Sequence, residues 1–160
     1  MLGVKLICVG KMREKHYIEA LREYEKRLTP FCRLEIEELA EYRLPENPSA
    51  AEIAAALDRE AEQILARIPA GAWVCALCIE GSMRSSEELA GLLEKLTVGG
   101  ISRAVFIIGG SFGLHARVKA RADERLSMSR MTFPHHMARV MLAEQLYRAF
   151  SIRSGGKYHK

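Results

Sequence analysis

The chain has 160 residues, of which 49% are hydrophobic and 28% are charged. This length allows one domain with a substantial hydrophobic core, and we expect residues 1–160 to form a single domain. The sequence has no apolar run of the roughly 18–20 residues that a membrane-spanning helix needs. Because the apolar stretch at the N-terminus is also too short for a signal peptide, we expect a cytoplasmic protein with no membrane partner.

The formal net charge of +4 is unevenly distributed along the chain. Residues 1–100 contain 13 Lys and Arg against 17 Asp and Glu, which gives −4, whereas residues 101–160 contain 11 against 3, which gives +8. A solvated basic face explains this asymmetry, and so does a surface that binds a polyanion.

The hydrophobic pattern predicts strands and helices in strict alternation. The predicted strands span residues 4–9, 32–39, 73–79, 104–108 and 125–127. The predicted helices span residues 14–28, 50–67, 86–98, 115–121 and 137–150. Strict alternation is typical of a parallel sheet covered by helices on both faces, and the imperfect alternation of 32–39 predicts an edge strand.

Local sequence signals predict where some helices begin and where loops and turns lie. Ser49 with Glu52 and Ser85 with Glu88 match the capping box at a helix N-terminus. Residues 40–48 predict a mobile loop, and residues 80–82 predict a turn after the third strand.

The four cysteines are Cys8, Cys32, Cys75 and Cys78, and the last two form a C-x-x-C motif. The motif lies inside a predicted strand, where positions i and i+3 point to opposite faces. No second pair of ligands follows to complete a zinc site. We therefore expect core cysteines and no metal.

Residues 103–136 contain a strand, a glycine turn at 109–113, a short basic helix, a short strand and a loop at 130–136. We expect the two strands of this stretch to be neighbours in the sheet. Ligands of open α/β sheets bind beyond the carboxyl ends of the strands. This stretch is therefore the predicted functional site.

The glycine turn allows several interpretations. A dinucleotide-binding fingerprint needs G-x-G-x-x-G and a later acidic residue, whereas this turn reads G-G-x-x-G and Arg130 occupies the later position. A nucleophile elbow would use Ser111, with Asp123 and His135, His136 or His159 completing a triad, although only 49 residues follow the serine. A tight structural turn and a turn that cradles a ligand are the remaining alternatives.

Several motifs in a fixed order extend over essentially the whole chain. They are Val9-Gly10-Lys11, the glycine turn with its flanking Ile108 and Leu114, Thr132-Phe-Pro-His135, Arg139-Val140, Glu144-Gln-Leu-Tyr-Arg-Ala149 and Tyr158-His159-Lys160. Together they resemble the SPOUT methyltransferase superfamily and, within it, the RlmH (YbeA-like) family.

The resemblance implies a parallel-sheet α/β/α sandwich whose C-terminal part forms a deep trefoil knot. It implies a homodimer, with the active site near the dimer interface, that methylates N3 of a pseudouridine in 23S ribosomal RNA. The substrate would be the subunit-interface hairpin of the assembled ribosome, and S-adenosylmethionine would be the cofactor. The implied cofactor contacts are Leu77, Gly109, Gly110, Met128, Ser129, Arg130, Met131, Thr132 and Phe133.

The residue chemistry agrees with this resemblance. Backbone amides and carbonyls suit the edge of adenine, and Leu77, Met128, Met131 and Phe133 supply apolar walls, although each of them, taken singly, is more typical of core packing. Methyl transfer needs no metal, because the sulfonium already carries the leaving group and the protein supplies alignment.

The target nitrogen is an imide that must lose its proton before or during attack. We predict that Arg139 or Arg148 stabilises the resulting anion and that His135 or His159 accepts the proton. The alternatives are structural histidines and a helix salt bridge between Arg148 and Glu144.

The C-terminal tail combines cationic and aromatic side chains, a combination that suits RNA. The predicted contacts are Arg153, Lys157, Tyr158, His159 and Lys160, and the alternative is a frayed terminus. A ribosome-binding protein without catalytic activity also stays open as a function.

Overall fold

The computed structural model describes residues 1–159, and in that range five strands alternate with five helices. The strands are β1 (Gly3–Val9), β2 (Arg33–Leu39), β3 (Trp73–Met83), β4 (Arg103–Ile108) and β5 (Glu124–Ser127). The helices are α1 (Lys15–Leu28), α2 (Ala50–Ala66), α3 (Ser86–Val98), α4 (Ala116–Arg121) and α5 (His135–Arg153). The predicted element order is confirmed.

The strands form one parallel sheet in the order β2-β1-β4-β3-β5. The edge position of β2 is confirmed. The expectation that β4 and β5 are neighbours is wrong, because β3 lies between them. Both edges of β4 are already paired, with β1 and with β3, so β5 joins the free edge of β3.

The strand β3 is longer than the sequence predicted, since residues 80–82 belong to the strand rather than to a turn. Its register against β5 shifts, so that both Leu77 and Ser82 pair with Leu126. Gly81 allows this close approach, because a Cβ atom there would lie 2.7 Å from the carbonyl carbon of Leu126. Because Gly81 has no side chain, β3 can continue past this shift in register.

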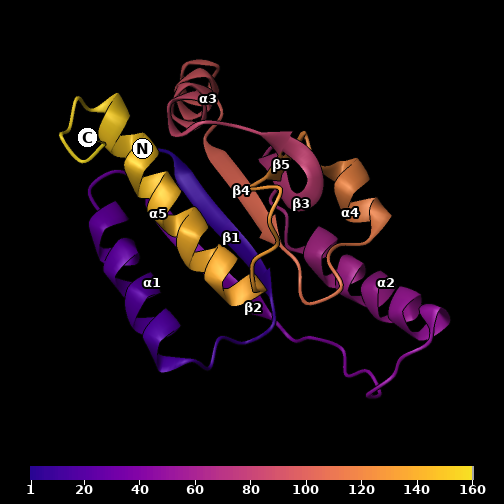
Figure 1. Cartoon of the computed structure of the whole chain (residues 1–160). Coiled ribbons are helices and arrows are strands. Elements are labelled where there is room, and N and C mark those ends of the chain that lie inside the picture. The colour runs from indigo at the N-terminus through magenta and orange to yellow at the C-terminus, as the bar shows by residue number, and fades with distance from the viewer. Residues whose placement is uncertain (160) are drawn as a thin grey trace.

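Helices cover both faces of the sheet, as predicted for an α/β/α sandwich (Figure 1). The helices α1, α3 and α5 lie on one face, where Leu6 and Phe106 are fully buried in the larger core cluster. The helices α2 and α4 lie on the other face, against Ile7 and Ile107. The trefoil knot stays a prediction.

The helix termini follow the capping signals closely. The hydroxyls of Ser49 and Ser85 accept the backbone N–H groups of Glu52 and Glu88, each at 3.1 Å. The helix α5 begins at His135, two residues earlier than predicted, because Pro134 occupies the N-cap position directly before it. The two histidines therefore lie in the first turn of a helix, not in a loop.

The four cysteines are free thiols. Burial of Cys8, Cys32 and Cys75 confirms the prediction of core residues, and burial raises the pKa of Cys8 to about 12 and that of Cys32 to about 11. Cys78 departs from the prediction, because it is only half-buried at the end of the sheet.

Two features are absent from residues 1–159. None of the helices there is long and apolar enough to cross a membrane. No group of three or more His, Cys, Asp or Glu side chains in the same range is placed to hold a metal ion.

Candidate functional site

A pocket of about 140 Å³ opens at the carboxyl ends of β3, β4 and β5. We call it the glycine pocket. Its lining residues are Leu77, Cys78, Ile108, Gly109, Gly110, Gly113, Leu126, Met128, Ser129, Met131, Phe133, His135 and Ala138. The pocket thus brings together most of the residues predicted to contact a cofactor, and one predicted catalytic histidine.

The glycine turn after β4 forms one wall of this pocket. The backbone N–H of Gly113 donates to the carbonyl of Gly110 at 3.1 Å, and Gly113 has a φ of +79°, which favours glycine. A Cβ atom on Gly109 would lie 2.5 Å from the carbonyl oxygen of Gly113. Only glycine therefore fits at position 109 without moving the backbone.

The loop after β5 forms the opposite wall. The hydroxyl of Ser127 donates to the carbonyl of Ser129 at 3.0 Å, and the Ser129 hydroxyl accepts the N–H of Met131, also at 3.0 Å. These bonds shape the loop so that it presents apolar side chains to the pocket. Arg130 and Thr132, also predicted to contact a cofactor, are exposed and do not line it.

The lining contains backbone groups, apolar side chains, one hydroxyl and one imidazole, but no Lys, Arg, Asp or Glu. Such a lining suits a neutral aromatic ring, and no cation is present to repel a positively charged group. Because pockets for drug-sized ligands usually have volumes of roughly 300–1,000 Å³, the glycine pocket fits part of such a molecule.

His135 is the predicted catalytic residue that lies at the glycine pocket. Burial lowers the pKa of His135 below its ordinary value of 6.5, and the neighbouring His136 and Arg139 lower it further, while Glu41 opposes the shift. The imidazole is therefore neutral at pH 7 and able to accept a proton.

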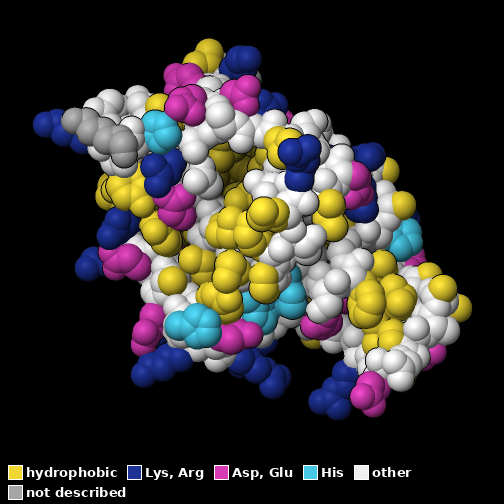
Figure 2. All heavy atoms as spheres, viewed as in Figure 1, with side chains coloured by type: hydrophobic (Ala, Val, Ile, Leu, Met, Phe, Trp, Pro, Cys, Tyr) yellow, Lys and Arg dark blue, Asp and Glu magenta, His cyan; other side chains and the backbone are white. Residues whose placement is uncertain are grey.

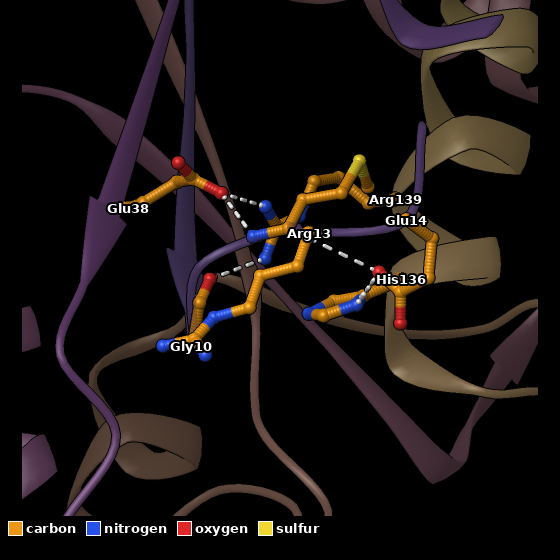
Figure 3. A network of polar contacts seen from close by, with 7 residues as sticks. Gly10, Arg13, Glu14, Glu38, His136 and Arg139 are labelled. Atoms are coloured by element: carbon orange, nitrogen blue, oxygen red, sulfur yellow. Dashed lines mark hydrogen bonds and ion pairs between the residues drawn. The ribbon is translucent and has the colours of Figure 1, made fainter. Parts of the chain in front are cut away.

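Arg139 is 1% exposed and does not line the pocket. One guanidinium nitrogen lies 2.6 Å from the carboxylate of Glu38, and another donates to the carbonyl of Gly10 at 2.9 Å. The same carboxylate accepts the backbone N–H of Met12 at 2.7 Å. Arg139 thereby ties α5 to β2 and to the turn after β1 (Figure 3).

His136 joins the same network from the first turn of α5. Its Nδ1 lies 2.9 Å from the carboxylate of Glu14, whereas its buried Nε2 has no hydrogen-bond partner among the described residues. We call Gly10, Gly110, His135 and His136 the ridge, because they separate the glycine pocket from a second cavity.

Arg148, the third predicted catalytic residue, lies with the C-terminal tail and not with the glycine pocket. Its guanidinium pairs with Glu144 at 2.5 Å, as the i, i+4 spacing indicated, and lies 4.7 Å from the centre of the Tyr158 ring. The Tyr158 hydroxyl donates to Glu144 at 3.2 Å. Burial, followed by the hydrogen bond with Tyr24 and the negative charge of Glu144, raises the pKa of Tyr158 to about 12.

The rest of the tail also folds back on the helices. His159 lies 2.7 Å from Glu87 at the start of α3, and Arg153 pairs with Glu94 at 2.6 Å. The described part of the tail is therefore docked and not frayed. Lys157 is exposed, and Lys160 lies outside the described residues.

The serine-hydrolase alternative finds no support in the geometry. Ser111 is exposed, and the hydrogen bonds of residues 1–159 include none between Ser111 and a histidine. The carboxylate of Asp123 accepts the backbone N–H of Val74 at 2.8 Å and so supports the sheet.

Two of the larger cavities were not predicted from the sequence. One, of about 530 Å³, lies between α3 and α5, where Figure 2 shows hydrophobic side chains lining a depression, and it shares Leu126 and Met128 with the glycine pocket. The other, of about 490 Å³, lies beyond the ridge. Both are assembled from distant segments, and Lys11, in the Val-Gly-Lys motif, was the one signal of the second.

Comparison with known proteins gives consistent matches over the whole chain. A family model described as "Predicted SPOUT methyltransferase" matches residues 2–159. A protein from Bacillus pumilus named "Ribosomal RNA large subunit methyltransferase H" is 46% identical over 159 residues, which are 99% of this chain and 100% of that protein. A protein of the same name from Clostridioides difficile is 47% identical, with the same coverage.

Solved structures agree at the level of the fold. A probable methyltransferase from Bordetella pertussis superposes with a TM-score of 0.56 at 17% identity, covering 93% of this chain and 95% of its own. A probable methylase family protein from Haemophilus influenzae gives a TM-score of 0.55 at 14% identity, covering 100% of this chain and 72% of its own.

Proposed function

Because the chain belongs to the SPOUT methyltransferase family, we propose that it transfers a methyl group from S-adenosylmethionine to N3 of a pseudouridine in 23S ribosomal RNA. The proposed substrate is the subunit-interface hairpin of the assembled ribosome in the cytoplasm. Two relatives that match over their full length are named ribosomal RNA large subunit methyltransferases, and this supports ribosomal RNA as the substrate class. The observation that carries the proposal is the uncharged glycine pocket at the sheet edge.

The methyl donor brings a methyl group already activated by a positively charged sulfur. In our proposal the backbone of Gly109 and Gly110 approaches the adenosine closely, between walls formed by Leu77, Met128 and Phe133. Ser129 and Met131 complete the lining, and the exposed Arg130 and Thr132 contact the part of the donor that extends beyond the pocket. Because the lining contains no Lys or Arg, no positive charge there repels the sulfonium.

The chain must also remove the proton from the target nitrogen. We assign this role to His135, because it lines the pocket and its lowered pKa keeps it neutral. Of the two arginines, Arg148 is accessible enough to stabilise the anion, whereas Arg139 is buried and acts by positioning the ridge.

We propose that three residues of the tail contact the RNA. Arg153 and His159 would bind phosphate groups, and Tyr158 would stack on a base.

We also propose a homodimer with the active site near the interface. The large depression between α3 and α5 supports this, because it adjoins the glycine pocket and its lining includes the partly exposed Met141 beside other apolar side chains. A Met141→Glu variant should sediment as a monomer while the wild type sediments as a dimer.

The test is methyl transfer from tritium-labelled S-adenosylmethionine to bacterial ribosomes that lack this modification, followed by nucleoside mapping. We expect label on one pseudouridine of 23S RNA and a rate about 10²- to 10⁴-fold lower for His135→Ala. His16→Ala is the matched control, since His16 is exposed on α1, and it should behave as wild type. Ribosome binding without any transfer would contradict the proposal and favour a non-catalytic binding protein.

A further inference from the structure

The second cavity has a composition unlike that of the glycine pocket. It is lined by Gly10, Lys11, Arg13, Ala40, Glu41, Tyr42, Arg43, Leu44, Phe112 and His136, and we call it the basic cleft. Four segments meet there: the turn after β1, the loop after β2, the glycine turn after β4 and the first turn of α5. Figure 2 shows Lys and Arg side chains at the lower edge of the molecule, where Figure 1 places the first two of these segments.

The cations of the basic cleft are free to bind a ligand. Lys11, Arg13 and Arg43 are exposed, and none of them has a salt bridge within residues 1–159. Most other cations near the carboxyl ends of the strands are engaged; for example, Lys119 pairs with Glu80. One carboxylate, Glu41, lies among the three cations, so the cleft keeps an excess of positive charge.

An aromatic ring accompanies these charges. Phe112 is 49% exposed at the tip of the glycine turn, an unusual position for a large apolar side chain. Flat aromatic rings beside cations are the elements with which proteins hold single-stranded nucleic acid, the ring stacking on a base while the cations bind phosphates.

The position of the cleft relates it to the reaction. Across the ridge the rings of His135 and His136 are 4.2 Å apart, and the first lines the glycine pocket while the second lines the cleft. Glu41 reaches the same ridge, because its carboxylate would lie 2.8 Å from a Cβ atom on Gly110. A nucleotide in the cleft would be next to one that reacts at the pocket.

We propose that the basic cleft binds a nucleotide that flanks the target in the RNA hairpin, with its base on Phe112 and the successive backbone phosphates around it on Lys11, Arg13 and Arg43. The inference deepens the proposed function and rests on it. The cleft is thus a substrate-recognition site separate from the docked C-terminal tail.

The experiment measures the binding of unmodified bacterial ribosomes by co-sedimentation at several salt concentrations, with methyl transfer measured in parallel. The test variant is Lys11→Ala/Arg13→Ala/Arg43→Ala. The control variant is Arg33→Ala/Lys95→Ala/Arg103→Ala, which removes three exposed cations, also without ion pairs, from the opposite end of the sheet. A Phe112→Ala variant tests stacking.

For the test variant we expect a ribosome Kd raised at least tenfold and a slope of log Kd against log salt reduced by ~2, since each lost phosphate contact on single-stranded RNA lowers the slope by roughly 0.7. Phe112→Ala should raise the Kd about fivefold or more with an unchanged slope. The control should match the wild type.

Equal binding by the test and control variants would overturn the inference, even if the wild type methylates ribosomes. Wild-type binding that depends on the cleft without any methyl transfer would overturn the proposed function and leave the cleft as an RNA site. Absence of wild-type binding would overturn both.

Discussion

The glycine pocket and the basic cleft lie side by side at the same edge of the sheet, but they are built from opposite chemistry. The pocket has no charged side chain in its lining and depends on backbone groups and apolar walls. The cleft has three cations that form no salt bridge with the described part of the chain, and an exposed aromatic ring. One end of a parallel sheet can thus present two neighbouring surfaces, one that we propose for a sulfonium donor and one that we propose for a polyanion.

The ridge between the two sites depends on Arg139, so its replacement should disturb both. We expect Arg139→Met to lower the free energy of unfolding by about 3 kcal/mol, because it leaves Glu38 and the Gly10 carbonyl without their donor. Urea denaturation measures the loss. A double variant that also carries Glu38→Gln should recover part of it, and no recovery would contradict a coupled pair.

The pocket side of the ridge is tested with two adjacent glycines. Gly109→Ala should lower the free energy of unfolding by roughly 1–3 kcal/mol, because the new Cβ meets the backbone of Gly113. Gly110→Ala should cost clearly less, because its Cβ meets the movable end of the Glu41 side chain. Thermal unfolding compares the two, and equal losses would contradict the close-packed turn.

The pH dependence sharpens the assignment of His135. The unfolded chain binds this proton near pH 6.5, but the folded chain binds it only at lower pH. The contribution of His135 to stability is therefore fully present above about pH 6.5 and is lost as the pH falls toward the folded pKa. Catalysis needs the same neutral form, so we expect the acid limb of kcat/KM, which reports the free enzyme, to lie below pH 6.5. An acid limb unchanged in His135→Gln would contradict the assignment.

A glycine away from both sites gives the smallest effect and a reference for the others. Gly91 lies inside α3, and a Cβ atom there would have no neighbour within 4 Å. Gly91→Ala should raise the free energy of unfolding by roughly 0.5–1 kcal/mol, since glycine is a poor helix former. Donor and ribosome affinities should stay at wild-type values in the same preparation.

Local patterns predicted the elements of the fold better than their pairing. The two serine capping boxes and the edge strand β2 followed from short-range sequence signals. The place of β5 beside β3 did not, because strand order depends on which edges are free once the other strands have paired. The extension of β3 depends on the space above Gly81, which only the folded backbone defines.

The same difference between local patterns and long-range packing applies to the candidate site. The glycine turn, the loop after β5 and His135 were predicted as site residues from contiguous motifs, and the structure places them around one pocket. The basic cleft was not predicted, since Lys11, Arg43 and Phe112 come from three loops far apart in the sequence. The half-buried position of Cys78 was not predicted, because its strand pattern indicated the core.

The most direct test of two separate sites is a calorimetric titration with S-adenosylmethionine. It compares the wild type, Phe133→Ala in the glycine pocket, and the Lys11→Ala/Arg13→Ala/Arg43→Ala variant of the basic cleft. We predict saturable binding to the wild type, at least tenfold weaker binding to Phe133→Ala, and an unchanged Kd for the cleft variant. Loss of donor binding in the cleft variant, with wild-type affinity in Phe133→Ala, would contradict this division of roles.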